Sequence, residues 1–216
     1  MTTRAVLFDL DGTLAHTAPD LGDALNALRG RHSLPPLPED QIRAHVSGGA
    51  AGLLALGFNV APADPSFAPL RDSYLEIYRE CLGMRTRFFP GIPELLAELE
   101  ARNIPWGIVT NKPARFTLPL LTTLGLLERA ASVVSGDTCS RPKPDPQPLF
   151  HAARETGVEP SACLFLGDAQ RDIEAARAAG MRPIVARYGY LAATDRPESW
   201  GAAALIDAPA ELLRWL

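Results

Sequence analysis

Short apolar runs alternate with amphipathic helical segments from residue 90 onward. The runs at 106–109, 132–134, 163–166 and 184–186, with a weaker run at 203–206, fit buried strands, and helical patterns at 92–102, 113–124, 148–156 and 169–179 separate them. This alternation is typical of a doubly wound parallel sheet with helices on both faces. The sequence therefore predicts an α/β fold.

The N-terminal stretch 6–14 supplies a further buried strand, which ends in Asp9 and Asp11 and is followed by Gly12. Ligands of parallel sheets bind beyond the carboxyl ends of the strands. Side chains two residues apart on an extended chain point the same way, so both carboxylates can face one pocket. Two such charges require a bound hard metal ion or a shared proton. By itself the motif is equally typical of a strand that ends in an Asp-Gly turn.

Residues 15–85 contain four helical segments, at about 17–30, 39–46, 50–56 and 67–82, and no convincing strand. Thr17 is expected to cap the first helix, with Asp20 at the spacing of a capping box. Because the first strand belongs with the later ones, the helical block is an insertion. We expect an α/β core formed by 1–14 and 86–216, with 15–85 as a helical cap over the strand ends.

Composition narrows the class of protein. The chain has 216 residues, 47% of them hydrophobic, which suits one large or two small domains. A net charge of −4 gives no footprint for nucleic acid, and no apolar run is long enough for a membrane span or a signal peptide. We expect a cytoplasmic protein, a monomer or a homodimer. Cys81, Cys139 and Cys163 are widely spaced and odd in number, so we expect free thiols rather than disulfides or a zinc site.

Polar residues follow the strands expected at 106–109 and 132–134. Thr110 and Asn111 come directly after the first of these, where a hydroxyl, an amide and the next helix's first amides can bind an anion; the alternative is that they cap this helix. Lys143 lies between two prolines in the loop after the second strand. A lysine restrained in this way loses less entropy on meeting an anion, although a solvated loop lysine fits the same pattern.

Two more carboxylates follow the strand expected at 163–166. Asp168 comes directly after it, and Asp172 lies in the next helical turn, where an acidic residue also serves as a partner of the helix dipole. With Asp9 and Asp11, they place several negative charges on one rim. A divalent cation relieves this repulsion, and a set of oxygen ligands favours Mg²⁺ over zinc.

These four motifs occur in the order found in one family. Asp9-Leu10-Asp11-Gly12-Thr13, Val109-Thr110-Asn111, Lys143-Pro144 and Gly167-Asp168 with Asp172 together resemble the haloacid dehalogenase superfamily, specifically its phosphatases with a helical cap. Segments 109–113 and 167–173 resemble the phosphoglycolate phosphatase branch. Segments 46–50, 187–190 and 200–202 also resemble the closely related bacterial N-acetylmuramic acid 6-phosphate phosphatases.

The resemblance implies a mechanism. Asp9 attacks phosphorus to form an aspartyl-phosphate, and Asp11 protonates the leaving alkoxide and later activates water. Asp9, Asp168 and the backbone carbonyl of Asp11 hold Mg²⁺. The substrate implied is a small phosphorylated metabolite.

The same resemblance assigns the remaining motif residues. Thr110, Asn111 and Lys143 take the charge of the transferred phosphoryl group, and Asp172 orients Lys143 or a water on the metal. Gly12 and Thr13 support the loop that carries Asp11. His16 and Ala169 depart from the family pattern, which puts specificity rather than chemistry in question.

The cap residues that choose the leaving group follow less directly from the sequence. Ser47 and Gly48 are expected to offer polar groups to substrate, or else form only a turn between helices. Arg43 or His45 can supply the cation that a carboxylate needs, and both phosphoglycolate and a muramic acid phosphate carry one. We expect a phosphatase most similar to phosphoglycolate phosphatase. The alternatives are an N-acetylmuramic acid 6-phosphate phosphatase, a phosphosugar mutase and a non-catalytic binding module.

Overall fold

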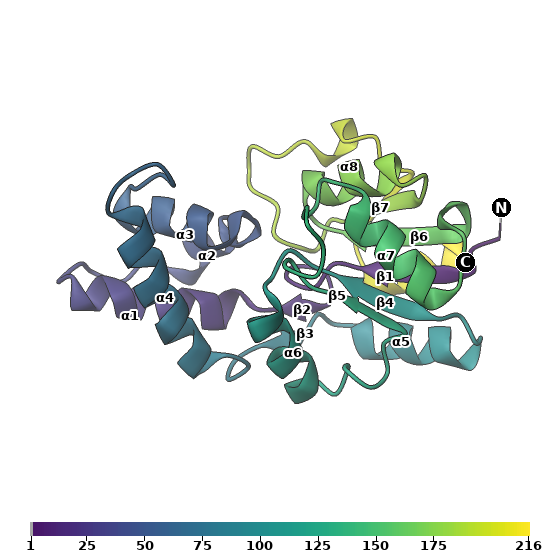
Figure 1. Cartoon of the computed structure of the whole chain (residues 1–216), viewed down its shortest axis with the longest axis horizontal. Helices are drawn as coiled ribbons and strands as arrows, with labels where there is room; N and C mark the ends of the chain where they lie inside the picture. The colour runs from purple at the N-terminus through teal and green to yellow at the C-terminus, as the bar shows by residue number, and fades with distance from the viewer. Residues whose placement is uncertain (1) are drawn as a thin grey trace.

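A computed structural model describes residues 2–216. Figure 1 shows a sheet flanked by helices at one end of the molecule and a second group of helices at the other, with the chain's C-terminus at the sheet end. None of the described helices has the length and apolar character needed to cross a membrane.

The sheet has six parallel strands in the order β5–β4–β1–β6–β7–β8. Their bounds are Ala5–Phe8 for β1, Trp106–Val109 for β4, Ser132–Val134 for β5, Cys163–Gly167 for β6, Arg182–Ala186 for β7 and Ala204–Ile206 for β8. The strand order reverses direction at β1, which pairs with β4 on one side and β6 on the other. This confirms the doubly wound α/β fold. Such a switch point opens a crevice at the strand ends, and Asp9 follows β1 there.

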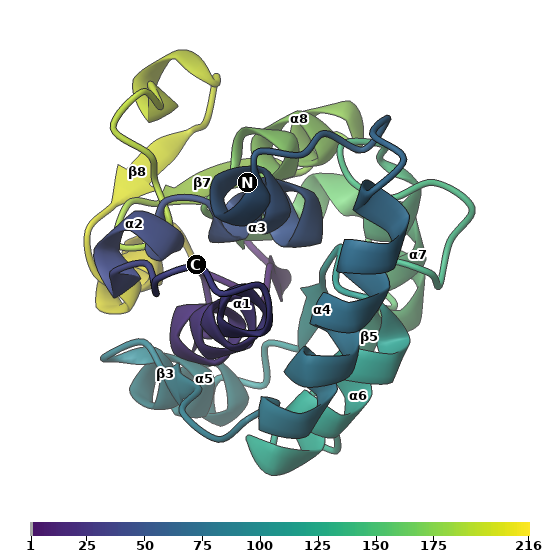
Figure 2. The ribbon, with the colours of Figure 1, turned by 90° about the vertical axis from the view of Figure 1, so that its left-hand side faces the viewer.

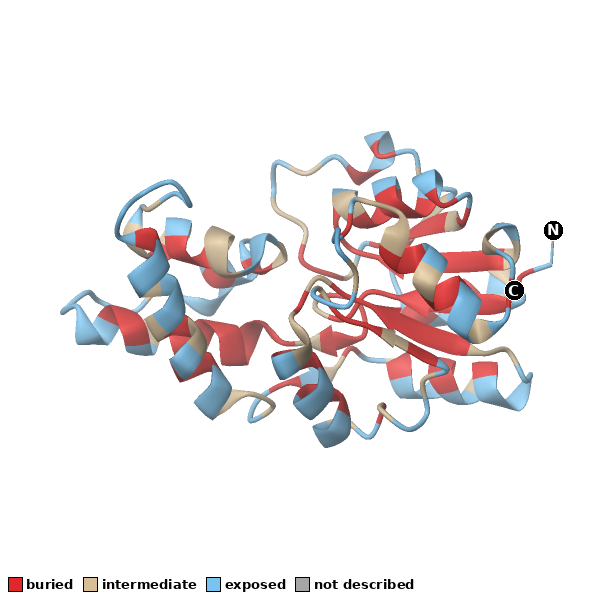
Figure 3. Cartoon of the chain, in the orientation of Figure 1, coloured by how far each residue is buried: buried red, intermediate tan, exposed pale blue. Residues whose placement is uncertain are grey.

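Helices cover both faces of the sheet. They are α5 (Ile92–Ala101), α6 (Ala114–Thr123), α7 (Gln147–Thr156) and α8 (Gln170–Ala178). Val6 and Phe8 belong to the core cluster that contains the apolar faces of α5 and α6, whereas Ala5 and Leu7 belong to the cluster that contains those of α7 and α8. Alternate residues of β1 therefore pack on opposite faces, as the pleat requires, and every β1 residue is buried (Figure 3).

The second helical group contains α1 (Ala18–Arg31), α2 (Glu39–Arg43), α3 (Gly49–Phe58) and α4 (Phe67–Cys81). Figure 2 looks onto this group end-on and shows α1 surrounded by the other helices. Leu21, Leu25 and Leu28 on α1 are buried, and so are Tyr74 and Tyr78 on α4. These are the apolar stripes visible in the sequence.

Two short strands lie where the chain crosses between the sheet and this helical group. β2 (Ala15–His16) pairs antiparallel with β3 (Arg87–Phe88). The expectation of no convincing strand within 15–85 is therefore wrong by one short strand, β2, because two residues are too few to show a period of two. We propose that this ribbon marks the boundary between core and cap.

The predicted capping box at the start of α1 is wrong. Thr17 occupies the N-cap position without a side-chain cap, because its hydroxyl donates a hydrogen bond to Asp11 Oδ1 at 2.7 Å. Asp20 is fully buried and accepts hydrogen bonds from the backbone N–H groups of Gly83, Arg85 and Thr86 and from the Thr86 hydroxyl. These donors lie where the chain passes back from the helical group to the sheet, so Asp20 links this passage to the start of α1.

We expect Asp20→Ala to destabilise the protein strongly, because it leaves buried donors without an acceptor. The loss should be about 3 kcal/mol or more, which corresponds to a fall in Tm of about 6–12 °C by differential scanning fluorimetry. Asp23→Ala is the control, since Asp23 pairs with Arg85 at an exposed site and such pairs contribute little. Equal melting temperatures for the two variants would contradict the role given to Asp20.

The three cysteines are free thiols, as expected. Burial raises the pKa of Cys81 and Cys163 to about 11, so both thiols stay protonated near neutral pH.

Arg187 forms a surface ion pair with Asp207.

Candidate active site

Asp9 lies at the carboxyl end of β1 and is only 3% exposed. Its backbone N–H donates to the Leu166 carbonyl of the neighbouring strand β6 at 2.9 Å, which fixes the chain at the point where β1 ends. The carboxylate Oδ1 accepts a hydrogen bond from Lys143 Nζ at 2.8 Å. Asp9 is therefore a rigidly held nucleophile candidate beside a single ammonium group.

Lys143 is buried and faces three acceptors. Its Nζ lies 2.8 Å from Asp9 Oδ1, 2.8 Å from Asp172 Oδ1 and 2.6 Å from the Val109 carbonyl oxygen. With 2% exposure, it is not a solvated loop lysine. The Asn111 side chain holds the Lys143 backbone from both sides, donating to its carbonyl at 2.8 Å and accepting from its N–H at 3.0 Å. The structure thus gives the Asn111 side chain a supporting contact rather than a free amide for substrate.

Asp9, Asp168 and Asp172 form a buried cluster in which one carboxylate oxygen from each lies within 4.8 Å of the others. Burial raises the pKa of Asp9 to about 6, although Lys143 opposes this shift. Burial, followed by the charges of Asp9 and Asp172, raises the pKa of Asp168 to about 8. Lys143 and the nearby Arg171 supply two positive charges against three carboxylates, so the cluster is still short of positive charge and its donor set fits a hard divalent cation.

The loop after β1 packs closely against Asp168. Gly12 has φ +89°, and a Cβ at this position would lie 2.2 Å from Asp168 Oδ2, so no side chain fits there. The Thr13 hydroxyl donates to Asp168 Oδ1 at 3.2 Å, and the Tyr190 N–H donates to Oδ2 at 2.9 Å. These contacts hold Asp168 toward Asp9.

The Asp11 side chain leaves this cluster and faces other partners. Its Oδ1 forms an ion pair with Lys112 Nζ at 3.0 Å and accepts a hydrogen bond from Thr17 at 2.7 Å. Sequence reasoning gave no role to Lys112 or to the Thr17 hydroxyl as partners of Asp11. The signal for Lys112 was its position directly after Thr110 and Asn111 at a strand end.

Thr110 is buried at the end of β4, and its hydroxyl oxygen accepts a hydrogen bond from the Lys112 N–H at 3.1 Å. The N-cap residue of α6 is Pro113, without a side-chain cap, so the capping alternative for Thr110 and Asn111 is not found. Thr110, Asn111 and Lys112 line a cavity of about 650 Å³ together with Asp9 and Asp11.

Residues of the helical group form the opposite wall of this cavity. Ser47 and Gly48 line it, and the Ser47 hydroxyl donates to Asp168 Oδ2 at 3.3 Å and to the Tyr190 carbonyl at 3.2 Å. Arg171, on α8, donates to the Ser47 carbonyl at 2.7 Å and also lines the cavity. Sequence reasoning gave Arg171 no role, although it lies between Asp168 and Asp172.

Arg43 does not line the cavity, so its contact with substrate stays a prediction. Its guanidinium donates to the carbonyl oxygens of Tyr188 and Gly189, which compete for it outside the cavity. His45 is exposed and its ring contacts the Gln41 carbonyl. His16 Nδ1 lies 2.9 Å from the Tyr190 hydroxyl, and burial lowers the pKa of this histidine.

A family model for haloacid dehalogenase-like hydrolases matches residues 3–180. The chain is 45% identical over 213 residues to the N-acetylmuramic acid 6-phosphate phosphatase of Pseudomonas aeruginosa, with 99% of this chain and 94% of that protein covered. The chain belongs to the haloacid dehalogenase-like hydrolases.

Further relatives of this hydrolase agree. It is 42% identical over 209 residues to the phosphoglycolate phosphatase of Xanthomonas campestris pv. campestris, covering 97% of this chain and 94% of that protein. The crystal structure of a predicted phosphoglycolate phosphatase from Haemophilus somnus matches with a TM-score of 0.86 at 27% identity, over 99% of this chain and 98% of that one. The family resemblance inferred from the motifs is confirmed, and this hydrolase is a phosphatase.

We expect Mg²⁺ to stabilise this phosphatase more at pH 8 than at pH 5.5. Because the folded-state pKa values of Asp9 and Asp168 lie above the ordinary 3.8, the metal-free protein holds protons that the unfolded chain has released, and its stability falls as pH rises from about 4 through 6 and 8. Metal binding requires the ionised carboxylates.

The measurement is Tm with Mg²⁺ and with excess chelator at both pH values. At about 100 times Kd, Mg²⁺ should add about 2.7 kcal/mol, or about 5–10 °C, at pH 8. Asp168→Asn should remove the gain. A gain of equal size at both pH values would exclude the buried carboxylates as the site.

Proposed function

We propose that this chain is an Mg²⁺-dependent phosphatase that releases phosphate from N-acetylmuramic acid 6-phosphate or a closely related phosphorylated amino sugar. The full-length identity of 45% to the Pseudomonas aeruginosa phosphatase of that name carries the proposal. The comparisons thus support N-acetylmuramic acid 6-phosphate, the alternative predicted from the sequence, better than phosphoglycolate. A cavity of about 650 Å³ supports it, because a sugar phosphate fills such a space better than the small phosphoglycolate molecule.

In the proposed mechanism, Asp9 Oδ attacks phosphorus and the bond from phosphorus to the ester oxygen breaks. Lys112 and Thr17 contact Oδ1 of Asp11, and in this mechanism Oδ2 carries the proton that Asp11 donates to the departing alkoxide. Asp11 then accepts a proton from the water that attacks the aspartyl-phosphate, which releases phosphate and restores Asp9. The contacts of Asp11 with Lys112 and Thr17 hold its carboxylate in place for both transfers.

The other site residues act on charge. Lys143 neutralises Asp9 and Asp172 before substrate arrives, and the Thr110 hydroxyl, which lines the cavity, donates to a phosphoryl oxygen. Asp9, Asp168 and the backbone carbonyl of Asp11 would hold Mg²⁺, with Asp172 beside them. The metal supplies positive charge that offsets the repulsion between the Asp9 carboxylate and the phosphate.

Phosphoglycolate remains the second candidate substrate, because relatives named for it are 42% identical over nearly the whole chain. A mutase or a binding module has no such support, since the relatives with full-length matches at this level are named as phosphatases.

Phosphate release from N-acetylmuramic acid 6-phosphate, 2-phosphoglycolate and an aryl phosphate, each with Mg²⁺ and with excess chelator, tests the proposal. The muramic acid phosphate should give the highest kcat/KM and depend on the metal. A higher kcat/KM for 2-phosphoglycolate would replace it with the second candidate. Formation of a phosphorylated isomer in place of free phosphate would indicate the mutase.

A further inference from the structure

The active-site cavity has a buried floor and an exposed mouth. Asp9 lies on the floor, whereas Arg71 of α4 and Arg115 of α6 line the same cavity and are exposed. One arginine belongs to the helical group and the other to a helix of the sheet unit. Their guanidinium groups therefore lie at the mouth, away from the position of the reacting phosphorus.

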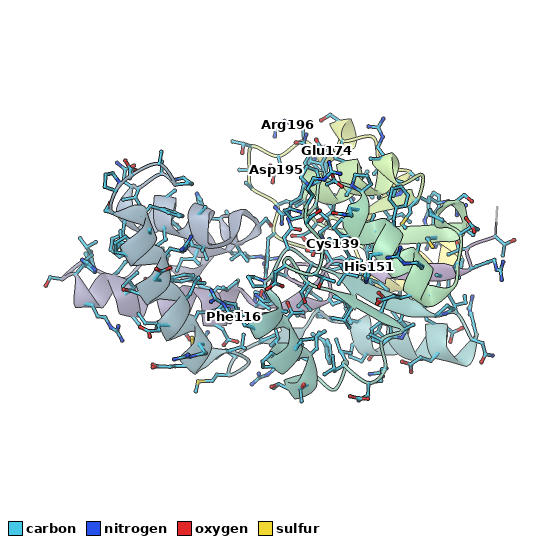
Figure 4. All side chains as sticks on the ribbon, viewed as in Figure 1. Phe116, Cys139, His151, Glu174, Asp195 and Arg196 are labelled. Atoms are coloured by element: carbon cyan, nitrogen blue, oxygen red, sulfur yellow. The ribbon has the colours of Figure 1, made fainter. Side chains whose placement is uncertain are left out.

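An aromatic contact joins α4 and α6 beside this cavity. The ring of Tyr78 on α4 lies 5.2 Å from that of Phe116 on α6, which Figure 4 labels at the end of α6 nearest the helical group. Arg115 precedes Phe116, and its guanidinium lies 4.9 Å from that ring. Arg71 lies seven residues before Tyr78, so the two share one face of α4.

The cavity lining is richer in positive charge than the rest of the chain. Four basic side chains line it (Arg71, Lys112, Arg115 and Arg171) against two acidic ones (Asp9 and Asp11), while the chain as a whole carries a net charge of −4. The two acidic groups already pair with lysines, Asp9 with Lys143 and Asp11 with Lys112. The excess positive charge therefore lies on the arginines.

Carboxylates of the protein compete only weakly for the two arginines at the mouth. Arg71 pairs with its neighbour Asp72 at 2.9 Å, where both side chains are exposed and the pair contributes little. Arg115 has no acidic partner among the residues that the structure describes. Both guanidinium groups are thus available to a second anion, and guanidinium binds carboxylate through paired hydrogen bonds.

We propose that Arg71 and Arg115 form a carboxylate-binding subsite, which selects phosphorylated sugars that carry a carboxylate far from the phosphate. This inference rests on the proposed function and names the residues that would set its specificity. A carboxylate held between α4 and α6 also ties the helical group to the sheet unit across the bound substrate.

The geometry separates the two candidate substrates. In N-acetylmuramic acid 6-phosphate the lactyl carboxylate is attached through O3, across the sugar ring from the phosphate on C6. In 2-phosphoglycolate a single methylene separates the carboxylate from the ester oxygen. With phosphorus beside Asp9 on the floor, only the sugar extends its carboxylate to the mouth.

The experiment compares N-acetylmuramic acid 6-phosphate with N-acetylglucosamine 6-phosphate, the same sugar without the lactyl group. Arg71→Ala and Arg115→Ala should each raise KM for the muramic acid phosphate by about 10- to 100-fold with little change in kcat. KM for N-acetylglucosamine 6-phosphate should hardly change, so the ratio of kcat/KM between the two substrates should fall toward one. Arg115→Lys should restore part of it.

Arg79→Ala is the matched control, because Arg79 is an exposed arginine of α4 outside the cavity. Equal losses on both sugars in the Arg71 and Arg115 variants, or an unchanged preference, would overturn the subsite and leave the proposed function standing. Failure of the unmodified protein to hydrolyse the muramic acid phosphate, with activity on an aryl phosphate, would overturn the proposed function and the subsite together.

Discussion

Asp9→Asn should abolish phosphate release while leaving the fold intact. Asparagine keeps the shape of the side chain and still accepts a hydrogen bond from Lys143, but its amide oxygen is too weak a nucleophile to displace an alkoxide from phosphorus. We expect kcat to fall by about 10⁴-fold or more, the scale seen when a covalent nucleophile is removed. Removing one of three buried like charges should leave Tm unchanged or raise it.

The measurement is phosphate release with Mg²⁺, together with a thermal melt of the same sample. Asp207→Asn makes the same change of charge at an exposed site and is the control. Asp207 pairs with Arg187 on the surface and is not part of the buried cluster. Rapid acid quench during turnover should trap a phosphorylated protein in the unmodified enzyme and not in Asp9→Asn. Residual activity within about tenfold of the unmodified enzyme would show that Asp9 is not the nucleophile.

The sheet could be predicted closely because burial leaves a direct trace in the sequence. The strands predicted at 106–109 and 132–134 have the same bounds in the structure. Both faces of these strands are covered, so continuous apolar runs mark them. Helix ends differ from prediction by up to three residues, since the last turn of a helix depends on contacts that a periodic pattern does not contain.

The contacts that organise the site could not be predicted because their partners are distant in the chain. Asp20 reads as a helix-start residue by local spacing, yet its hydrogen-bond donors arrive more than 60 residues later, from Gly83 to Thr86. Lys112 follows strand β4 and Asp11 follows strand β1, so their ion pair depends on how these two strands lie side by side. Arg43 has the charge that a substrate needs, but the carbonyl oxygens of residues 188 and 189 compete for it.

The candidate site was predictable to the extent that chemistry restricts residue types. Carboxylates at the ends of adjacent strands β1 and β6 must converge, so Asp9 and Asp168 follow from topology alone. Asp11 follows from its spacing, but the direction of its side chain does not. The structure separates its carboxylate from the buried cluster, which fits our proposal that the cluster holds a cation and that Asp11 transfers protons.

Lys143→Met should have the largest effect on stability as well as a large effect on turnover. The ammonium group contacts two carboxylates, Asp9 and Asp172, at sites where all three side chains are almost inaccessible to solvent. Removing one partner of a buried ion pair leaves uncompensated charge, which costs about 3–5 kcal/mol and lowers Tm by about 6–20 °C. Activity should fall as well, since the Lys143 ammonium then no longer helps to offset the charge of Asp9 against the incoming phosphate.

The pH dependence of this loss follows from the same contacts. Lys143 lowers the pKa of Asp9, which burial has raised to about 6, so its removal moves that pKa higher. A carboxyl whose folded-state pKa is raised destabilises the protein as pH rises through that value. The Tm difference between Lys143→Met and the unmodified protein, measured with chelator, should therefore be larger at pH 8 than at pH 5.5.

The double variant Lys143→Met/Asp172→Asn separates stability from catalysis. Removing the Asp172 charge relieves part of the repulsion, so Tm should recover partly relative to Lys143→Met, whereas phosphate release should stay low because Asp9 still lacks its cation. Recovery of both would mean that Lys143 serves only to stabilise the fold. The single variant Asp172→Asn completes the comparison. If the fall in Tm of the double variant equals the sum of the falls in the two single variants, Lys143 and Asp172 do not interact, which would contradict the 2.8 Å between Lys143 Nζ and Asp172 Oδ1.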